Sequence, residues 1–210
     1  MSGFLISLEG GEGAGKTTVL NALRECLLAQ NFEVITTREP GGSITGEKIR
    51  DILLSPELNL FSETELLLMF AARAQLVREA IQPAIARGAA VVSDRFTDAS
   101  FAYQGGGRGL DMGRIAELER WAAVIKPDLT FLLDVSVQQG LERARLRGGE
   151  LDRIELERED FFERVRATYL NRAKNEPQRF RVIDASQSPE SVVVQVKEKL
   201  ILWLQTRNKT

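Results

Sequence analysis

The sequence predicts an α/β fold in which a five-stranded parallel sheet lies between two layers of helices, a three-layer αβα sandwich. Short apolar runs of strand character alternate with longer stretches of helical periodicity along the whole chain. Strands separated by helices need right-handed crossovers, which make neighbouring strands parallel and cover both faces of the sheet. The length of 210 residues suits a single domain, residues 1–210, without an internal linker or repeat.

The individual elements follow from these patterns in chain order. Strands are expected at residues 4–9, 33–37, 90–94, 129–134 and 180–184. Helices are expected at about 16–30, 46–54, 63–87, 111–125, 137–147, 154–174 and 189–205. Pro83 should kink or restart the third of these helices, and Gly88 suits its C-terminal stop. The three glycines at 105–107 are expected to form a bend and not a helix.

Composition narrows the possible functions. The chain has 28 Lys and Arg against 30 Asp and Glu, a net charge of −2, so neither nucleic acid nor a membrane surface is an expected partner. The longest apolar run, 66–72, is too short to span a bilayer, and the N-terminus shows no signal peptide, so a cytoplasmic location is expected. The chain lacks histidine, which excludes histidine-based acid–base chemistry and metal sites. The single cysteine, Cys26, is expected to be a buried apolar residue.

A glycine-rich loop between the first strand and the first helix is the strongest motif. It fits the pattern Gly, four residues, Gly-Lys-Ser/Thr of the P-loop, whose backbone N–H groups surround nucleotide phosphates. The expected ATP-binding residues are Gly10, Gly11, Glu12, Gly13, Ala14, Gly15, Lys16, Thr17 and Thr18. Lys16 is suited to reach the β- and γ-phosphates, and Thr17 is suited to hold Mg²⁺. The alternative, a chance glycine-rich turn, does not explain the strand–loop–helix context.

Charged residues follow two other strands at the same edge of the sheet, where ligands bind in parallel sheets. Arg38 precedes the turn Pro40-Gly41-Gly42 and has the planar, doubly donating group that suits phosphate. Asp94 ends the third strand at the position that serves Mg²⁺, directly or through water, and Arg95 follows it. Taken singly, Arg38 and Arg95 could be solvated arginines, and Asp94 could be a helix-capping aspartate.

Two helical segments carry further candidates. Ser100 and Gln104 are four residues apart, so a helix would present both to one small polar ligand. Phe70 and Arg73 share a face of the helix at 63–87, although an aromatic residue at this spacing is more often part of a core. The segment of about 143–157 is rich in arginine around a double glycine, which suits a lid that closes over phosphates, or else a solvated helix pair.

Together these segments resemble the nucleoside monophosphate kinases, and specifically the bacterial thymidylate kinases. The resemblance covers nearly the whole chain. It rests on five segments: Glu9–Thr18, Arg38-Glu39-Pro40-Gly41-Gly42, Asp94-Arg95-Phe96, Ala102–Gly109 and Leu151-Asp152-Arg153. It implies a P-loop fold with an arginine-rich lid, transfer of the γ-phosphate of ATP to dTMP to give dTDP for dTTP synthesis, a requirement for Mg²⁺, and a homodimer.

The resemblance also implies roles for residues at matching positions. For dTMP, Glu12 meets the 3′-hydroxyl, Arg38 and Arg95 hold the phosphate, Arg73, Ser100 and Gln104 read the thymine edge, and Tyr103 packs against the sugar. For catalysis it implies Lys16, Asp94, Arg95 and a lid arginine, because the loop position that carries an arginine in some members is Gly13 here. We assign that role to Arg153, with Arg143 and Arg147 in support, and we assign the metal to Thr17 and Asp94. The segment Asp184-Ala185-Ser186 is expected near the adenine.

Two positions depart from the family pattern. The phenylalanine that usually stacks on thymine stands four residues before the base-reading arginine, where this chain has Met69, with Phe70 one position later. Phe70 is our assignment for the thymine contact, with Met69 as the alternative. Phe96 replaces the Tyr or His that often follows the Asp-Arg pair, so no hydroxyl or imidazole is expected there.

Other reactions remain open at this stage. A kinase of the same fold acting on dGMP, dCMP or a nucleoside is the nearest alternative, but the pair Arg38 and Arg95 favours an acceptor that already bears a phosphate. A GTPase should carry an Asn-Lys-x-Asp motif, and an ABC-type ATPase should carry Leu-Ser-Gly-Gly-Gln. The sequence contains neither.

Overall fold

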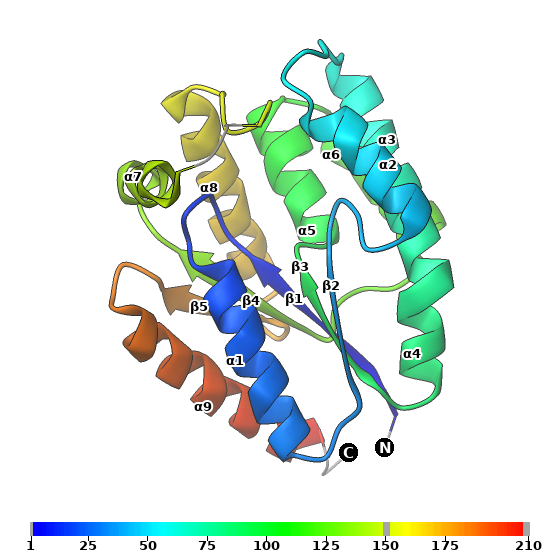
Figure 1. Ribbon diagram of the computed structural model, residues 1–210, viewed down its shortest axis with the longest axis vertical. Coiled ribbons are helices and arrows are strands. Elements are labelled where there is room, and N and C mark those ends of the chain that lie inside the picture. The colour runs from blue at the N-terminus through cyan, green and yellow to red at the C-terminus, as the bar shows by residue number, and fades with distance from the viewer. Residues whose placement is uncertain (1, 149–151, 208–210) are drawn as a thin grey trace.

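A computed structural model describes residues 2–148 and 152–207, with the backbone alone at Arg147 (Figure 1). Within that part, five strands form one all-parallel sheet in the order β2-β3-β1-β4-β5. The strands are β1 Phe4–Glu9, β2 Val34–Arg38, β3 Ala90–Asp94, β4 Leu129–Asp134 and β5 Phe180–Asp184. The α/β prediction and all five predicted strands are confirmed, with β2 shifted by one residue.

Helices cover both faces of the sheet (Figure 1). The α-helices are α1 Lys16–Ala29, α2 Ile44–Leu54, α3 Ser62–Leu76, α4 Gln82–Ala86, α5 Thr97–Ser100, α6 Met112–Leu118, α7 Val137–Arg147, α8 Glu159–Asn175 and α9 Pro189–Arg207. Three π-helical segments join them: η1 Val77–Ile81, η2 Phe101–Gly107 and η3 Glu119–Ala123. Among the described residues, no helix is long and apolar enough to cross a membrane.

Alternation along β1 divides the core between the two faces. Phe4, Ile6 and Leu8 pack with apolar residues of α1 and α9. Leu5 faces the opposite side, where it packs with η1 and α4. Because strand side chains alternate, Ser7 and Glu9 fall on that second face, where both are fully buried. Polar groups therefore lie under the sheet edge that carries the glycine loop.

The long helix around Pro83 is interrupted as expected. The π-helical turn η1 immediately precedes α4, where Pro83 occupies the first turn, so its missing N–H leaves no helical bond unmade. Gly88 adopts φ 92°, and the N–H of Ala89 donates to the carbonyl of Ala84, which is the usual C-terminal closure of a helix.

Two helix predictions were wrong. The glycines at 105–107 continue a helix as part of η2. They stand where an added Cβ would collide with neighbouring elements. A Cβ at Gly106 would lie 2.1 Å from Thr168 Oγ1, and one at Gly107 would lie 2.4 Å from a ring carbon of Phe161. Their absence lets η2 approach α8 closely. The helix expected from residue 154 begins only at Glu159, because residues 153–156 form turns that follow Asp152, whose carboxylate accepts from two backbone N–H groups.

Candidate active site

A cleft of about 600 Å³ opens at the carboxyl edge of the sheet. Its wall is formed by the glycine loop, the ends of β2 and β3, the helices α2, α3, η2 and α7, and residues 152–155. Ten predicted site residues line it: Glu12, Gly13, Gly15, Lys16, Thr17, Thr18, Arg38, Asp94, Arg95 and Tyr103. The sheet order explains this, since β1 lies between β3 and β4 and its C-terminal loop stands at the point where the strand order changes direction.

The glycine loop has the backbone conformation that its sequence requires. Gly13 and Gly15 adopt φ of 67° and 88°, which side-chain-bearing residues rarely take. A Cβ at Gly13 would lie 2.0 Å from the carbonyl oxygen of Gly140 in α7. The loop therefore packs directly on α7, and an arginine at position 13 would not fit this packing.

Lys16 folds back over the loop. Its Nζ donates to the carbonyls of Gly10 and Gly11 at 3.3 and 3.0 Å. Burial and the nearby Arg95 lower the pKa of the Lys16 ammonium below its ordinary value. Two backbone carbonyls thus hold the ammonium where the loop's N–H groups would receive phosphate oxygens.

Arg95 leaves β3 in a strained, left-handed backbone conformation with φ 69°. Its backbone is held by its N–H bond to Leu8 O and by the Ser93 hydroxyl, which donates to the Arg95 carbonyl at 2.6 Å. Its guanidinium donates to Gly10 O at 3.0 Å and to Glu12 Oε1 at 2.7 Å. The end of β3 is therefore tied to the glycine loop.

Glu12 joins Arg95 to Tyr103. The Tyr103 hydroxyl donates to the same Oε1 atom at 3.0 Å, and the Arg95 guanidinium lies 4.7 Å from the centre of the Tyr103 ring. The three side chains come from β1's loop, β3's end and η2. They form one group within the cleft wall.

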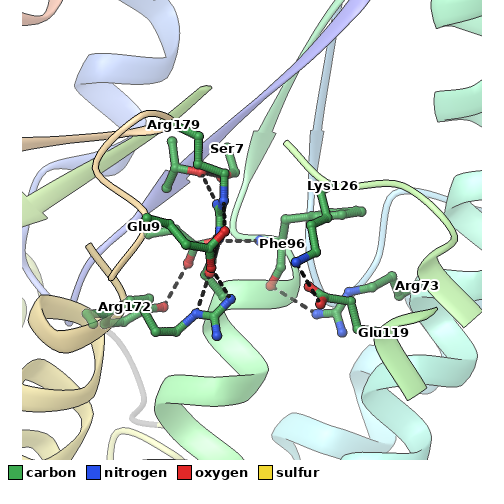
Figure 2. Close-up of polar contacts among 12 residues, drawn as sticks. Ser7, Glu9, Arg73, Phe96, Glu119, Lys126, Arg172 and Arg179 are labelled. Atoms are coloured by element: carbon green, nitrogen blue, oxygen red, sulfur yellow. Dashed lines mark hydrogen bonds and ion pairs between the residues drawn. The ribbon is translucent and has the colours of Figure 1, made fainter. Parts of the chain in front are cut away.

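Glu9, the last residue of β1, is completely buried next to Phe96 (Figure 2). Its Oε1 accepts from the Phe96 N–H and its Oε2 from the Tyr169 hydroxyl, both at 2.8 Å. Burial, with the nearby Asp98, raises the pKa of the Glu9 carboxyl to about 8. Arg172 and Arg179 lie on either side of Glu9 in Figure 2, and both form ion pairs with buried Asp98. Glu9 thus supports the Arg95 corner and is not a residue of the cleft wall.

Two arginines, Arg38 and Arg50, line the cleft beside the turn that follows β2. Arg38 is exposed and pairs with Glu47 at 3.0 Å, while Arg50 of α2 donates to the Pro40 carbonyl at 2.8 Å. Burial and the positive charge of Arg38 lower the pKa of Arg50. The sequence analysis missed Arg50. The feature of the sequence that could have pointed to Arg50 is its place on the helix that directly follows the Arg38–Gly42 turn.

The residues expected to read a base lie just behind the cleft. Arg73, Ser100 and Gln104 are almost fully buried and are not part of its lining. Arg73 donates to Glu39 Oε2 at 2.7 Å, to Ser100 Oγ at 3.0 Å and to the Phe96 carbonyl at 3.1 Å, the last shown in Figure 2. Ser100 and Arg73 are therefore brought together as predicted, with Glu39 as a partner that the sequence analysis missed.

The assignment of Phe70 to the cleft was wrong. Phe70 is buried in an apolar cluster with Leu66, Phe101 and Ile115, and its ring packs 4.6 Å from the Arg73 guanidinium. Met69 lines the cleft in its place. One residue turns a helix by about 100°, so the shift of one position sends the aromatic ring to the core side of α3.

The lid arginines occupy different places. Arg143 lines the cleft and donates to the carbonyls of Ala185 and Ser186 at 2.7 and 3.2 Å. Arg153 does not line it, because its side chain bonds to the Leu53 carbonyl at 3.0 Å and to buried Glu65 at 2.6 Å. The Arg147 side chain and residues 149–151 of the lid lie outside the described part of the chain.

The arrangement places a phosphate-binding loop and an anion-binding corner in one cleft, and comparison with known proteins agrees with it. A profile of the family described as thymidylate kinase matches residues 8–196. The chain belongs to the thymidylate kinase family.

Individual relatives support the same conclusion. A thymidylate kinase of Pseudomonas syringae pv. tomato is 55% identical over 190 residues, which are 90% of each chain. One of Ruthia magnifica is 50% identical over 93% of this chain and 96% of its own. The crystal structure of thymidylate kinase from Ehrlichia chaffeensis superposes with a TM-score of 0.76 at 31% identity and covers 98% of this chain and 99% of that one. Thymidylate kinases thus share both the sequence and the fold of this chain over nearly its full length.

Proposed function

We propose that this chain transfers the γ-phosphate of ATP to dTMP and forms dTDP. The observation that carries the proposal is that one cleft joins Lys16 and Thr17 of the glycine loop to Arg38, Arg50 and Arg95. Two nucleotides bound at these two sets would bring their phosphates together. Holding both reactants in place is the main requirement for phosphoryl transfer.

The donor half of the cleft suits ATP with Mg²⁺. Thr17 lies in the first turn of α1, and the Asp94 Oδ1 atom is buried without a hydrogen-bond partner among the described residues. Such an unpartnered oxygen fits a metal or its water, and Mg²⁺ typically takes one or two protein ligands with phosphates and water. When bound there, Mg²⁺ neutralises phosphate charge. Thr17 and Asp94 would hold it.

The acceptor half suits a monophosphate. Arg38 and Arg95 would bind the phosphate of dTMP, and Arg50 adds positive charge to the same side. Glu12 and Tyr103 would contact the sugar, and Arg73, Ser100 and Gln104 would read the thymine edge, with Met69 against the ring. Met69, Ala99 and Tyr103 form the part of the cleft wall nearest in sequence to these buried residues, so they would have to move to admit the base.

The reaction needs no general base. A phosphomonoester has a second pKa of roughly 6, so the attacking oxygen is already ionised at neutral pH. Lys16 and Arg95 offset the charge of the two meeting anions, which is the main barrier. This requirement agrees with a sequence that lacks histidine.

A lid arginine completes the proposed site. We assign this role to Arg153, which must exchange its bond with Glu65 for one with the transferred phosphate. Arg143 already lines the cleft and would support the ATP side. Asp184, Ala185 and Ser186 would then lie near the adenine, because Arg143 bonds to two of these three residues.

A homodimer is part of the proposal. Leu67 of α3 and Trp121 of η3 are 58% and 76% exposed, and Phe61 just before α3 is 77% exposed. Large apolar side chains exposed on neighbouring elements are typical of a surface that packs against another chain. A second copy of this chain would cover them.

A coupled ADP-release assay with Mg-ATP tests the reaction. The acceptors are dTMP, dUMP, dCMP, dGMP, dAMP and thymidine. We expect strong turnover of dTMP, weaker turnover of dUMP and little turnover of the others. Turnover of thymidine or of another base in preference to dTMP would overturn the acceptor assignment.

A further inference from the structure

We propose that Glu65 is a specificity-determining residue, which orients the Gln104 amide so that the acceptor site takes thymine and rejects cytosine. Glu65 lies on α3, is 1% exposed and does not line the cleft. It would act through Gln104 and is therefore a positioning residue. The inference rests on the proposed function and adds a determinant of which pyrimidine the site accepts.

Glu65 receives hydrogen bonds on both carboxylate oxygens. Its Oε1 accepts from Gln104 Nε2 at 2.8 Å, and its Oε2 accepts from Arg153 at 2.6 Å. Arg108 also donates to it through Nε, at 3.4 Å to Oε1 and 3.3 Å to Oε2. Although burial opposes ionisation, the bonds from Gln104 and the charge of Arg108 outweigh it and lower the pKa of Glu65. Glu65 is therefore an ionised, acceptor-only group.

An acceptor-only neighbour fixes which end of the Gln104 amide faces it. The amide nitrogen must point to Glu65, and the carbonyl oxygen must then point away. That oxygen is buried and has no hydrogen-bond partner among the described residues. A buried oxygen left without a partner is costly, so the site favours a ligand that supplies an N–H group.

The two pyrimidines differ in this respect. Thymine carries an N–H at ring position 3 and a carbonyl oxygen at position 4. Cytosine has an unprotonated nitrogen at position 3 and an amino group at position 4. A fixed carbonyl oxygen on Gln104 can accept from thymine, whereas it repels the ring nitrogen of cytosine. A buried hydrogen-bonding group that finds no partner on the wrong substrate is the usual basis of strong discrimination between two substrates.

The variant Glu65→Gln should reverse the amide of Gln104. The carbonyl of the new side chain stays on the Oε2 side, because Arg153 and Arg108 donate there. Its NH₂ group then replaces Oε1 and faces Gln104, which must turn its own oxygen toward it. The Gln104 NH₂ group is thereby released for the ring nitrogen of cytosine.

The test measures kcat/KM for dTMP and for dCMP in the wild type, Glu65→Gln and Glu65→Asp, after circular dichroism has shown that each is folded. For Glu65→Gln we expect the dTMP/dCMP ratio to fall at least about 10-fold, which is about 1.4 kcal/mol, with kcat/KM for dCMP rising above the wild-type value. For Glu65→Asp, which keeps an acceptor-only group, we expect the ratio to stay close to that of the wild type.

The outcomes separate this role from a structural one. If Glu65 only stabilised the fold, the isosteric Gln variant would be the milder one and both substrates would lose activity in proportion, which would overturn the proposal. If Glu65→Gln does not fold, a dTMP/dCMP ratio that collapses in Glu65→Asp overturns it and a retained ratio supports it. Failure of the wild type to phosphorylate dTMP would refute the proposed function itself, whatever the variants do.

Discussion

At the scale of single residues, the cationic side chains of the cleft are already held by groups of the protein. Arg95 is held by Glu12, Arg38 by Glu47, and Lys16 by two loop carbonyls. These contacts hold the cationic groups in fixed positions along the cleft. Arg153 differs, since its partner Glu65 lies outside the cleft wall.

The position of Arg153 leads to a prediction. If it reaches the transferred phosphate only in the transition state, Arg153→Ala should lower kcat by about 10³-fold and leave the KM for dTMP nearly unchanged. Arg38→Ala should instead raise that KM and leave kcat closer to the wild-type value. Steady-state kinetics measures both. A matching loss of dTMP affinity in Arg153→Ala would remove it from the catalytic role.

Glu9 leads to a prediction about pH. Its pKa is raised to about 8 from the ordinary 4.5, mainly by burial, so between these values the folded protein holds a proton that the unfolded chain releases. The free energy of unfolding contributed by Glu9 therefore falls as pH rises from about 4.5 to about 8. Glu9→Gln lacks this loss and should gain stability relative to the wild type between pH 6 and pH 8. Urea unfolding at both pH values measures it, and a constant difference would contradict the assignment.

Most, but not all, of the site was predictable residue by residue. Lys16, Asp94 and Arg95 line the cleft because a motif and a strand end place them there. Phe70 does not, because the rotation of α3 about its axis depends on packing against Phe101 and Ile115, which local spacing does not reveal. Arg50 and Glu39 were missed because their roles depend on a turn that folds back between β2 and α2.

At the scale of elements, the packing of η2 against α8 depends on glycine. Gly105, Gly106 and Gly107 lie in η2, which also carries Tyr103 and Gln104. Glycine normally weakens a helix, so the sequence pattern indicated a bend. The close approach of α8 offsets that cost here, and it involves residues more than fifty positions apart. The late start of α8 likewise depends on Asp152, whose carboxylate organises turns that compete with a helix.

The glycine packing predicts the effect of Gly106→Ala. Its Cβ would lie 2.1 Å from Thr168 Oγ1 and 3.0 Å from the backbone oxygen of Arg164, so α8 must move. We expect a loss of about 1–3 kcal/mol in the free energy of unfolding. Gly113→Ala in α6 is the control, because an added Cβ there would meet no atom of another helix or strand within 4 Å and only the carboxylate of Asp111, at 3.0 Å. Thermal and urea unfolding compare them, and equal stability of the two variants would refute the packing argument.

At the scale of the whole molecule, the sheet order brings the residues of the cleft together. The glycine loop follows β1, and its neighbour β3 ends at Asp94 with Arg95 directly after it. The alternation of strands and helices does not determine this order, because several orders of parallel strands satisfy the same sequence pattern. The alternation predicted a parallel sheet, and the order β2-β3-β1-β4-β5 is a result of the structure.

The exposed apolar residues lead to a prediction about assembly. If α3 and η3 form the dimer surface, Trp121→Glu should convert a dimer into a monomer, because a buried unpaired carboxylate opposes association. Sedimentation equilibrium of the wild type and the variant measures the mass. Glu117→Gln, on the exposed part of α6, serves as a control that should not change it. A wild-type mass of one chain would refute the dimer.

The two ends of the described chain meet at the base of the sheet (Figure 1), where Arg207 donates to the carbonyls of Ser2 and Gly3. Helix α9 also supplies Val196, Leu200 and other apolar residues to the core behind β1. A growing chain that has reached only Asp184 has made every strand of the sheet, yet one face of its central strand still lacks part of its cover. The glycine loop is synthesised among the first residues, whereas the α9 residues that pack behind β1, the strand leading into that loop, are synthesised among the last. Folding of this site is therefore expected to finish only after synthesis has passed α9.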